Sequence, residues 1–207
     1  MSLKTHELHG PGKHESNSGR RKKIIREWVE SLVVAFLLAM VIRTFVIQAF
    51  KIPTGSMRPT LLEKDLILVN KFIYGAKVPF SNTRLPSVRQ PMRGDVIVFI
   101  YPEDPQKDFI KRLVGLPGET VEIKDGTIYI NDKPLLDPTF NKVYYYNRGD
   151  YALDGKKITV PKDNFFVLGD NSASSKDSRY WGFVPRRSIL GKALVIYWPL
   201  NRIRIIK

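Results

Sequence analysis

Ser56 is the residue whose neighbours best suit nucleophilic chemistry. It lies in the stretch Phe50 to Leu61, "FKIPTGSMRPTL". Pro53 and Pro59 fix φ and exclude helix, while Gly55 has no Cβ and lets another molecule approach the backbone beside the serine. Two interpretations are open, because an apolar run precedes the stretch. It is either a hinge where the chain leaves a membrane, which its shape alone favours, or a segment that presents the Ser56 hydroxyl to a substrate.

The base that could activate such a serine is restricted by the composition. The sequence has no cysteine, and its three histidines are His6, His9 and His14. If the apolar run spans a membrane, these histidines lie on the opposite side from Ser56, which excludes a Ser-His-Asp triad. The base is then a lysine or a carboxylate. Only carboxylates remain for a metal site, and no clustered ligand spacing is evident, so we expect no metal and no cofactor.

A lysine that acts as a base must be neutral, although its reference pKa is about 10.4. Apolar burial has to lower that pKa by several units. Lys111 in "DFIKRLVGLPGETV" meets this requirement better than most, because Phe109, Ile110 and Leu113 surround it. A lysine on a strand usually faces solvent, however, so these neighbours alone do not single it out.

A third polar stretch, "VLGDNSASSKDSRYWGFVP", runs from Val167 to Pro185. A strand leads into a loop rich in Ser, Asn and Asp, where Asp177 and Arg179 could pair and hold the loop in shape. The stretch is either a capped surface turn or a packed functional loop. Its length and the aromatic pair that closes it favour the functional loop.

The apolar run from Trp28 to Phe50 has about the 20 residues that a membrane-spanning helix needs. A cleavable signal peptide and a buried soluble helix are the competing interpretations. The formal net charge of +14 favours an anionic partner, and basic residues gather directly before the run, which indicates lipid. By the positive-inside rule the N-terminus is then cytoplasmic and everything after Phe50 lies outside. The basic residues are Arg20, Arg21, Lys22, Lys23 and Arg26.

The remainder predicts an all-β fold: a largely antiparallel, barrel-like sheet core. Short apolar runs alternate with turn signals, and Asp125–Gly126 between two alternating arms gives the strongest hairpin signal. Residues 124–160 have few aliphatic side chains and predict a small inserted β subdomain. We therefore expect a disordered basic tail at 1–27, a transmembrane helix at 28–50, a catalytic core at 51–123 and 161–207, and the insert. The expected strands are 66–70, 95–101, 109–115, 120–131, 164–170 and 192–199.

Together these stretches resemble bacterial type I signal peptidases, membrane-anchored Ser/Lys proteases that remove signal peptides from exported proteins. "PTGSMRPTL" is similar to the nucleophile motif of that family, and "RGDVIVF", "IKRLVGLPGE" and "GDNSASSKDSRYWGFVP" are similar to its later motifs. The four occur in the family's order after an apolar segment. The resemblance extends from that segment to Pro199 and is specific because all four are present.

The resemblance implies a role for each matching position. Ser56 would be the nucleophile, and Lys111 the general base that later protonates the leaving amine. Thr54 would offer its hydroxyl, with the Ser56 backbone N–H, to the oxyanion. Ser175 would orient the Lys111 amine, and Asp177 with Arg179 would brace the loop.

Two positions depart from the family's usual pattern. Ser172 stands where an arginine is usual, which puts one loop-bracing contact in question. Thr54 replaces a serine found in many members but keeps the hydroxyl.

The resemblance also implies the substrate. A peptide would add to the active-site segment by strand pairing and be cut after a small-x-small motif at the outer face of a bacterial cytoplasmic membrane. The expected partners are signal peptides of preproteins and membrane lipid, with no nucleic acid. Two shallow pockets for small side chains would be walled by Ile52, Pro53, Met57, Leu61, Phe109 and Ile110.

Two other functions remain open from the sequence. The same Ser/Lys pair could act on the chain itself or on one dedicated partner. Alternatively, a membrane-tethered binding module without catalysis could recruit an anionic polymer, which predicts steeply salt-dependent nucleic-acid binding. The basic residues after residue 50 are scattered along the chain, and this argues against the binding module.

Overall fold

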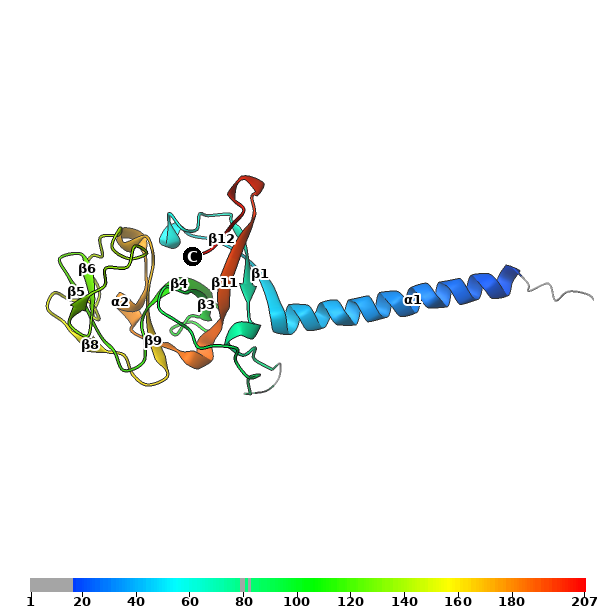
Figure 1. Ribbon diagram of the computed structural model, residues 1–207, viewed down its shortest axis with the longest axis horizontal. Coiled ribbons are helices and arrows are strands. Elements are labelled where there is room, and N and C mark those ends of the chain that lie inside the picture. The colour runs from blue at the N-terminus through cyan, green and yellow to red at the C-terminus, as the bar shows by residue number, and fades with distance from the viewer. Residues whose placement is uncertain (1–16, 79–80, 82) are drawn as a thin grey trace, which may run out of the picture. The chain divides into compact units, whose positions relative to one another are not determined.

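A computed structural model describes residues 17–78, 81 and 83–207 (Figure 1). The three histidines and most of the predicted disordered tail lie outside the described residues. The chain divides into two compact units, Met1–Val41 and Ile42–Lys207. Each unit is described separately below.

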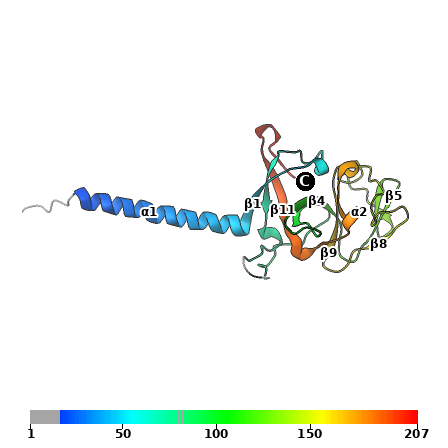
Figure 2. The same ribbon diagram turned by 180° about the vertical axis from the view of Figure 1, so that it is seen from behind.

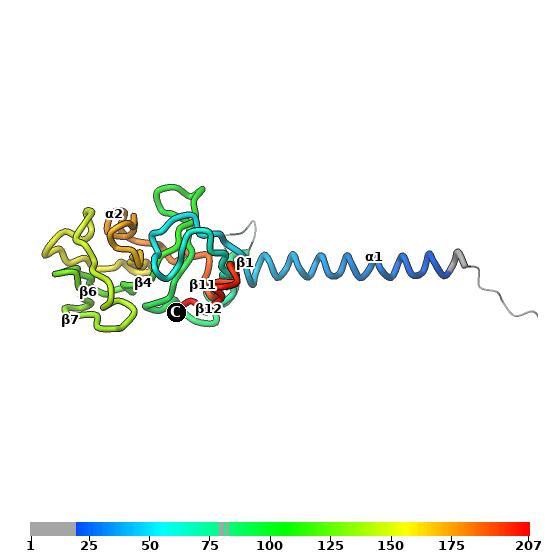
Figure 3. The backbone as a smooth tube through the Cα atoms, turned by 90° about the horizontal axis from the view of Figure 1, so that it is seen from above, coloured from blue at the N-terminus to red at the C-terminus, as the bar shows by residue number. Residues whose placement is uncertain are grey.

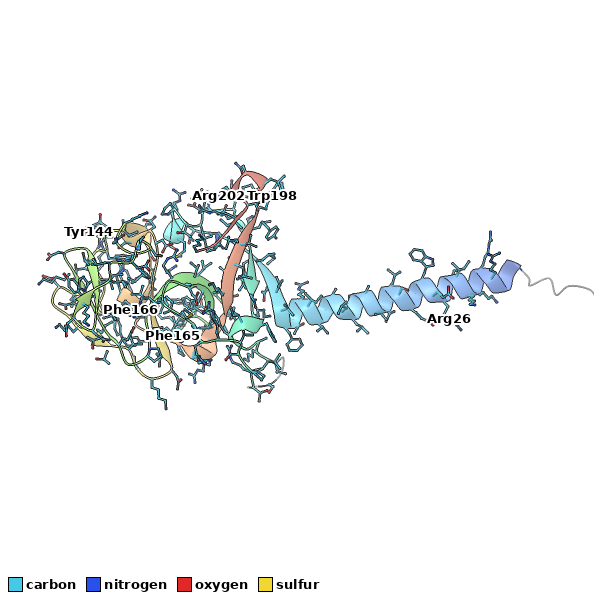
Figure 4. All side chains as sticks on the ribbon, in the orientation of Figure 1. Arg26, Tyr144, Phe165, Phe166, Trp198 and Arg202 are labelled. Carbon is cyan, nitrogen blue, oxygen red and sulfur yellow. The ribbon has the colours of Figure 1, made fainter. Side chains whose placement is uncertain are left out.

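Helix α1 occupies Asn17–Val41. It starts ten residues before the predicted boundary at 27, because residues from Arg20 onward are mostly good helix formers. Within the described residues, Arg20–Val46 is the one helical segment long and apolar enough to cross a membrane, judged by length and composition. Its apolar side chains are exposed, with Leu32 and Phe36 each 64% exposed, and they project around the helix (Figure 4).

The predicted span ended at Phe50, and this boundary is wrong. A π-helical turn over Ile42–Val46 follows α1, and then Ile47–Lys51 forms strand β1. Strand β1 pairs antiparallel with β2 (Leu66–Asn70), so that Phe50 lies opposite Ile67. The apolar pattern continues without a break, but the partner strand and the packing of Phe50 against the core favour a strand over further helix.

The main sheet has eight strands in the order β1-β2-β11-β3-β4-β9-β10, with β12 also paired to β11. All of its pairings are antiparallel, so the predicted largely antiparallel β fold is confirmed. The predicted strands are also present within a few residues. Their bounds are β3 Val96–Ile100, β4 Asp108–Gly115, β9 Asn164–Leu168, β10 Val184–Pro185, β11 Ile189–Trp198 and β12 Arg204–Ile205.

A second sheet of four strands, in the order β7-β6-β5-β8, lies within the same unit (Figures 2 and 3). Asp125 and Gly126 connect β5 to β6 and both have positive φ, as a two-residue hairpin turn requires. The sheet starts at Thr120, four residues before the predicted insertion, because β5 pairs with both β6 and β8. The strands are β5 Thr120–Lys124, β6 Thr127–Ile130, β7 Lys133–Pro134 and β8 Ile158–Thr159.

The short helices connect the strands of the two sheets. Helix α2 is a single turn over Ser178–Trp181, between β9 and β10. Five turns of 3-10 helix lie at Gly55–Met57, Phe72–Tyr74, Ser172–Ser174, Arg186–Ser188 and Leu200–Arg202.

Strand β3 is buried on both faces, which explains its continuous apolar sequence. Val96 and Val98 pack into one cluster with residues of β2 and β11, whereas Ile97 and Phe99 pack into another with Trp181. A third cluster joins the small sheet to β9. Phe165 and Phe166 of β9, labelled in Figure 4, belong to the second and third clusters. The strand pair β3–β4 is therefore held rigidly, and β4 carries Lys111.

Candidate active site

Ser56 and Lys111, which lie 55 positions apart in the sequence, meet in the structure. A 2.8 Å hydrogen bond joins Lys111 Nζ to Ser56 Oγ. Lys111 Nζ also donates to the carbonyl oxygen of Ile110 at 2.9 Å and lies 5.3 Å from the centroid of the Phe109 ring. The two side chains are almost buried, because Ser56 is 8% and Lys111 4% exposed.

The burial of Lys111 changes its acidity. Removal of the amine from water lowers the pKa of Lys111 to about 8, from 10.5, while the negative charges of Asp177 and Asp170 raise it. Each of these carboxylates is paired with an arginine, Arg179 and Arg112 respectively, which reduces their pull on the proton. About a tenth of Lys111 is therefore neutral at pH 7, and about half at pH 8.

Ser56 lies on a 3-10 turn, Gly55–Met57, instead of the extended segment that the two prolines predicted. The turn is held from the loop after β9. The Asn171 side chain donates to the Gly55 carbonyl, and its backbone N–H donates to the Ser56 carbonyl, both at 3.0 Å. Asn171 was not singled out from the sequence. The sequence did offer a signal for Asn171, because it lies in a polar run two residues beyond Gly169, near the expected end of the strand.

The loop from Gly169 to Trp181 is held by a buried ion pair. Arg179 Nε lies 2.8 Å from Asp177 Oδ1, and both residues are 0% exposed, so the predicted pairing is present. Asp177 also accepts a hydrogen bond from the backbone N–H of Gly169 at 3.0 Å. The pair therefore joins α2 to the end of β9, next to the nucleophile turn.

Ser172, the departure from the family pattern, takes part in this network. Its hydroxyl accepts hydrogen bonds from Arg179 Nη1 at 2.9 Å and from the backbone N–H of Tyr146 at 3.0 Å, and its carbonyl accepts from Arg179 Nη2 at 2.8 Å. Ser172 therefore braces the loop through Arg179, although an arginine is usual at its position. Through Tyr146 it also reaches the segment between the strands of the small sheet.

A second buried ion pair was missed in the sequence. Arg112 donates to both carboxylate oxygens of Asp170 at 2.7 Å, and also to the Gly94 carbonyl at 2.8 Å. The residues are 3% and 6% exposed. A charged residue in an otherwise apolar strand needs a buried partner, so the position of Arg112 could have predicted a buried ion pair. The partner, 58 positions away, had no sequence signal of its own.

Thr54 and Ser175 are placed differently from each other. Thr54 is exposed and lines the same cleft as Ser56 and Lys111. Ser175 is 6% exposed, and its hydroxyl has no hydrogen-bond partner among the described residues. The structure gives Ser175 no hydrogen bond to Lys111, so its orienting role stays a prediction.

The cleft at Ser56 has a volume of about 370 Å³, and a smaller cavity of about 30 Å³ adjoins it. Pro53, Phe109 and Ile110 line both, and Ile52 lines the smaller one. Met57 and Leu61 were predicted to wall these pockets, but both are fully buried and pack in the core cluster with residues of β2 and β11. The cleft is also lined by Thr54, Gly55, Asp108, Ser174 and Lys176. The sequence did not predict that Asp108, Ser174 and Lys176 line the cleft, or that Phe50 lines the smaller cavity.

The described residues contain no evident metal site. Across residues 17–78, 81 and 83–207, no three acidic, histidine or cysteine side chains gather where they could hold a metal ion. What the site does contain is a hydroxyl, a partly neutral amine and an open cleft. These three features suit nucleophilic attack by Ser56 on a carbonyl.

Comparisons with known proteins agree on one family. The family model described as "Signal peptidase, peptidase S26" matches residues 25–198. Signal peptidase I of Pseudomonas aeruginosa is 35% identical over 86% of this chain and 75% of its own length. Signal peptidase I of Leptolyngbya laminosa is 37% identical over 93% and 89%, and probable signal peptidase I-2 of Synechocystis is 39% identical over 86% and 77%. A crystal structure of a signal peptidase I from Enterococcus faecalis is 36% identical, covering 50% of this chain and 97% of its own, with a TM-score of 0.39.

Proposed function

We propose a specific reaction for this chain on the premise that it belongs to the signal peptidase family, peptidase S26. It is a serine endopeptidase that removes N-terminal signal peptides from exported preproteins. The observation that carries the proposal is the 2.8 Å hydrogen bond between Ser56 Oγ and Lys111 Nζ at a nearly buried position. No histidine of the chain follows residue 14, so Lys111 is the group available as base.

The reaction proceeds in two halves. Neutral Lys111 accepts the proton of Ser56 as its oxygen attacks the scissile carbonyl, and the resulting ammonium then protonates the leaving amine. After the amine product leaves, neutral Lys111 deprotonates a water that attacks the acyl carbonyl, and the ammonium returns this proton to Ser56 Oγ as the acyl–oxygen bond breaks. The Ser56 backbone N–H and the Thr54 hydroxyl stabilise the oxyanion in both halves, and such donors lower the barrier by about 3 kcal/mol each.

Substrate selection follows from the apolar end of the cleft. Pro53, Phe109 and Ile110 leave shallow space there, which suits small side chains at the first and third positions before the cut. Strand β4 pairs with β3 from Asp108 onward but with β9 only from Arg112 onward. In the described part of the chain, one edge of Asp108–Lys111 is therefore free to pair with a substrate strand.

The site operates at a membrane surface in this proposal. Residues 20–46 anchor the chain in the cytoplasmic membrane, and the basic residues at its start keep the N-terminus in the cytoplasm. The chain from Ile47 onward then lies outside and contacts lipid. Within it, residues 51–119 and 160–207 form the catalytic core, and residues 120–159, which carry the small sheet, form an inserted subdomain.

The test uses the full chain purified in detergent with a signal-peptide substrate that contains a small-x-small motif. The wild type should cut the substrate, and mass spectrometry of the products should place the cut directly after the motif. Ser56→Ala and Lys111→Met should each abolish cleavage and leave the circular dichroism spectrum unchanged. Lys107→Met is the matched control, because Lys107 is exposed and pairs with Asp104, and it should retain full activity.

Two results would contradict the proposal. Full activity in either of the first two variants would remove the Ser/Lys assignment. Cleavage of the chain itself or of one partner, with several exported preproteins left intact, would favour the narrower alternative.

A further inference from the structure

The cleft at Ser56 has two chemically different ends. Pro53, Phe109 and Ile110, together with Asp108, line one end, which continues into the small, mostly apolar cavity. The loop after β9 contributes Ser174 and Lys176 to the lining of the cleft but not to that cavity, so the part of the cleft at this loop is separate from the cavity. A substrate that places its small residues at the apolar end, with the scissile bond at Ser56, therefore carries the residues after the cut towards Lys176.

Lys176 is held at this end by specific contacts. Its Nζ lies 3.0 Å from Glu103 Oε2 and 5.4 Å from the centroid of the Tyr101 ring. The Tyr101 hydroxyl donates to Glu103, and the Tyr101 ring stacks on Phe109 with centroids 4.1 Å apart and planes 4° from parallel. These contacts fix the ammonium beside an aromatic pair whose second ring lines the cleft.

Lys176 also keeps donors free for a ligand. An ammonium has three N–H donors, and Glu103 accepts one of them. The side chain is 59% exposed, so a substrate group can reach it. Tyr101 and Glu103 raise the pKa of Lys176, in contrast to Lys111, the other lysine of the cleft. Lys176 is therefore cationic under the conditions in which Lys111 acts as a base.

We propose that Lys176 is a specificity-determining residue that favours substrates with an acidic side chain among the first three residues after the cleaved bond. The inference rests on the proposed function, because it takes the direction of the substrate from the apolar end of the cleft. A carboxylate at one of these positions accepts a hydrogen bond from Lys176 Nζ beside Glu103. A lysine at the same position is repelled.

The experiment measures kcat/KM for a series of small-x-small peptides cut by the full chain in detergent. The peptides carry glutamate, glutamine or lysine at the first, second or third position after the cut. Wild type should prefer glutamate over lysine by about fivefold at one or more of these positions, as expected for a partly exposed ion pair. The preference should weaken as salt is added.

Variants of the same chain separate this contact from general electrostatics. Lys176→Met should abolish the preference, and Lys176→Glu should reverse it. Glu103→Gln should strengthen it, because Lys176 then has no competing carboxylate. Lys107→Met removes an equal charge from the β3–β4 connection, which also carries Glu103, outside the lining of the cleft, and should leave the preference unchanged.

Each outcome decides the matter. Equal cleavage of all peptides by wild type, or an undiminished preference in Lys176→Met, would overturn the inference while the proposed function stands. A loss of preference in Lys107→Met as large as in Lys176→Met would assign it to overall charge and also overturn the inference. Failure to cut any peptide would instead overturn the proposed function, and this inference with it.

Discussion

At the scale of single residues, the proposed chemistry depends on the protonation of Lys111. Burial favours the neutral amine, and the nearby carboxylates of Asp177 and Asp170 favour the ammonium. Burial dominates, so the pKa settles at about 8. The amine is then a usable base near neutral pH, and as an ammonium it is acidic enough to protonate a leaving amine.

The first prediction concerns the pH dependence of cleavage. Because the proposed mechanism uses the neutral form of Lys111 as the base, kcat/KM should rise about tenfold per pH unit below the pKa and level off above about pH 8. The measurement is kcat/KM for one peptide between about pH 6 and 10. A profile that is flat over this range would exclude Lys111 as the titrating base.

The same pKa shift affects stability, with a definite sign. The folded-state pKa of about 8 is below the ordinary value of 10.5, so the unfolded chain binds more protons at Lys111 between these values. The free energy of unfolding therefore gains a contribution that increases with pH across this window and is constant above it. Lys111→Met should lack this contribution. The measurement is the free energy of unfolding of wild type and of the variant as a function of pH, and the difference between the two curves gives the contribution of Lys111.

At the scale of elements, strand β4 directs two adjacent basic side chains, Lys111 and Arg112, to different partners. Successive side chains of a strand point to opposite faces, so Lys111 reaches Ser56 while Arg112 reaches Asp170. The lysine remains without a carboxylate partner and can lose its proton. The arginine pairs with Asp170, which holds the end of β9 and the start of the active-site loop against β4.

The third prediction follows from the Arg112–Asp170 pair. Arg112→Met leaves a buried carboxylate unpaired and should lower the free energy of unfolding by about 3–5 kcal/mol. It should also raise the midpoint of the pH–rate profile, because the uncompensated charge of Asp170 then raises the pKa of Lys111 further. Denaturant unfolding and the peptide assay measure the two effects.

Two controls accompany this variant. Lys157→Met breaks an exposed pair with Asp132 and should cost less than about 1 kcal/mol. The double variant Arg112→Met, Asp170→Asn should return the pH midpoint towards that of wild type, because the charge that acts on Lys111 is gone. An unchanged midpoint in the single variant would mean that Asp170 has no electrostatic effect on the base.

Much of the element structure is predictable because its signals are local. The alternating arms around Asp125–Gly126 and the apolar run of β3 specify strands within a few residues. The boundary between α1 and β1 has no such local signal. Ile47 to Phe50 continues the apolar pattern of the helix, and only pairing with β2, about twenty positions later, makes it a strand.

The site was predictable to the extent that its residues match family motifs. Ser56 and Lys111 were assigned in this way, and the structure places them in contact. The hydrogen bonds of Asn171 to the nucleophile turn required coordinates, because they join segments more than 100 positions apart. The prediction for Met57 failed for a different reason: an apolar residue beside a nucleophile can pack in the core instead of lining a substrate pocket, and the sequence does not distinguish the two.

At the scale of the whole molecule, the candidate site and the proposed membrane anchor belong to separate units. The residues of the candidate site, from Ile52 to Arg179, and all three core clusters lie in the unit Ile42–Lys207. The other unit contributes α1, whose apolar side chains are exposed. The catalytic unit should therefore fold without the anchor, and the anchor should act by concentrating enzyme and substrate in one membrane.

The last prediction removes the anchor. A variant that lacks residues 1–41 should cut a soluble signal peptide with kcat/KM within about twofold of the full chain, because no group at the site is lost. On a preprotein inserted in lipid vesicles it should be slower by about a hundredfold, since tethering provides an effective concentration of about millimolar. The soluble peptide is the internal control: loss of both activities would mean that folding needs the helix. Equal rates on vesicles would mean that surface contacts of the catalytic unit suffice to bring it to its substrate.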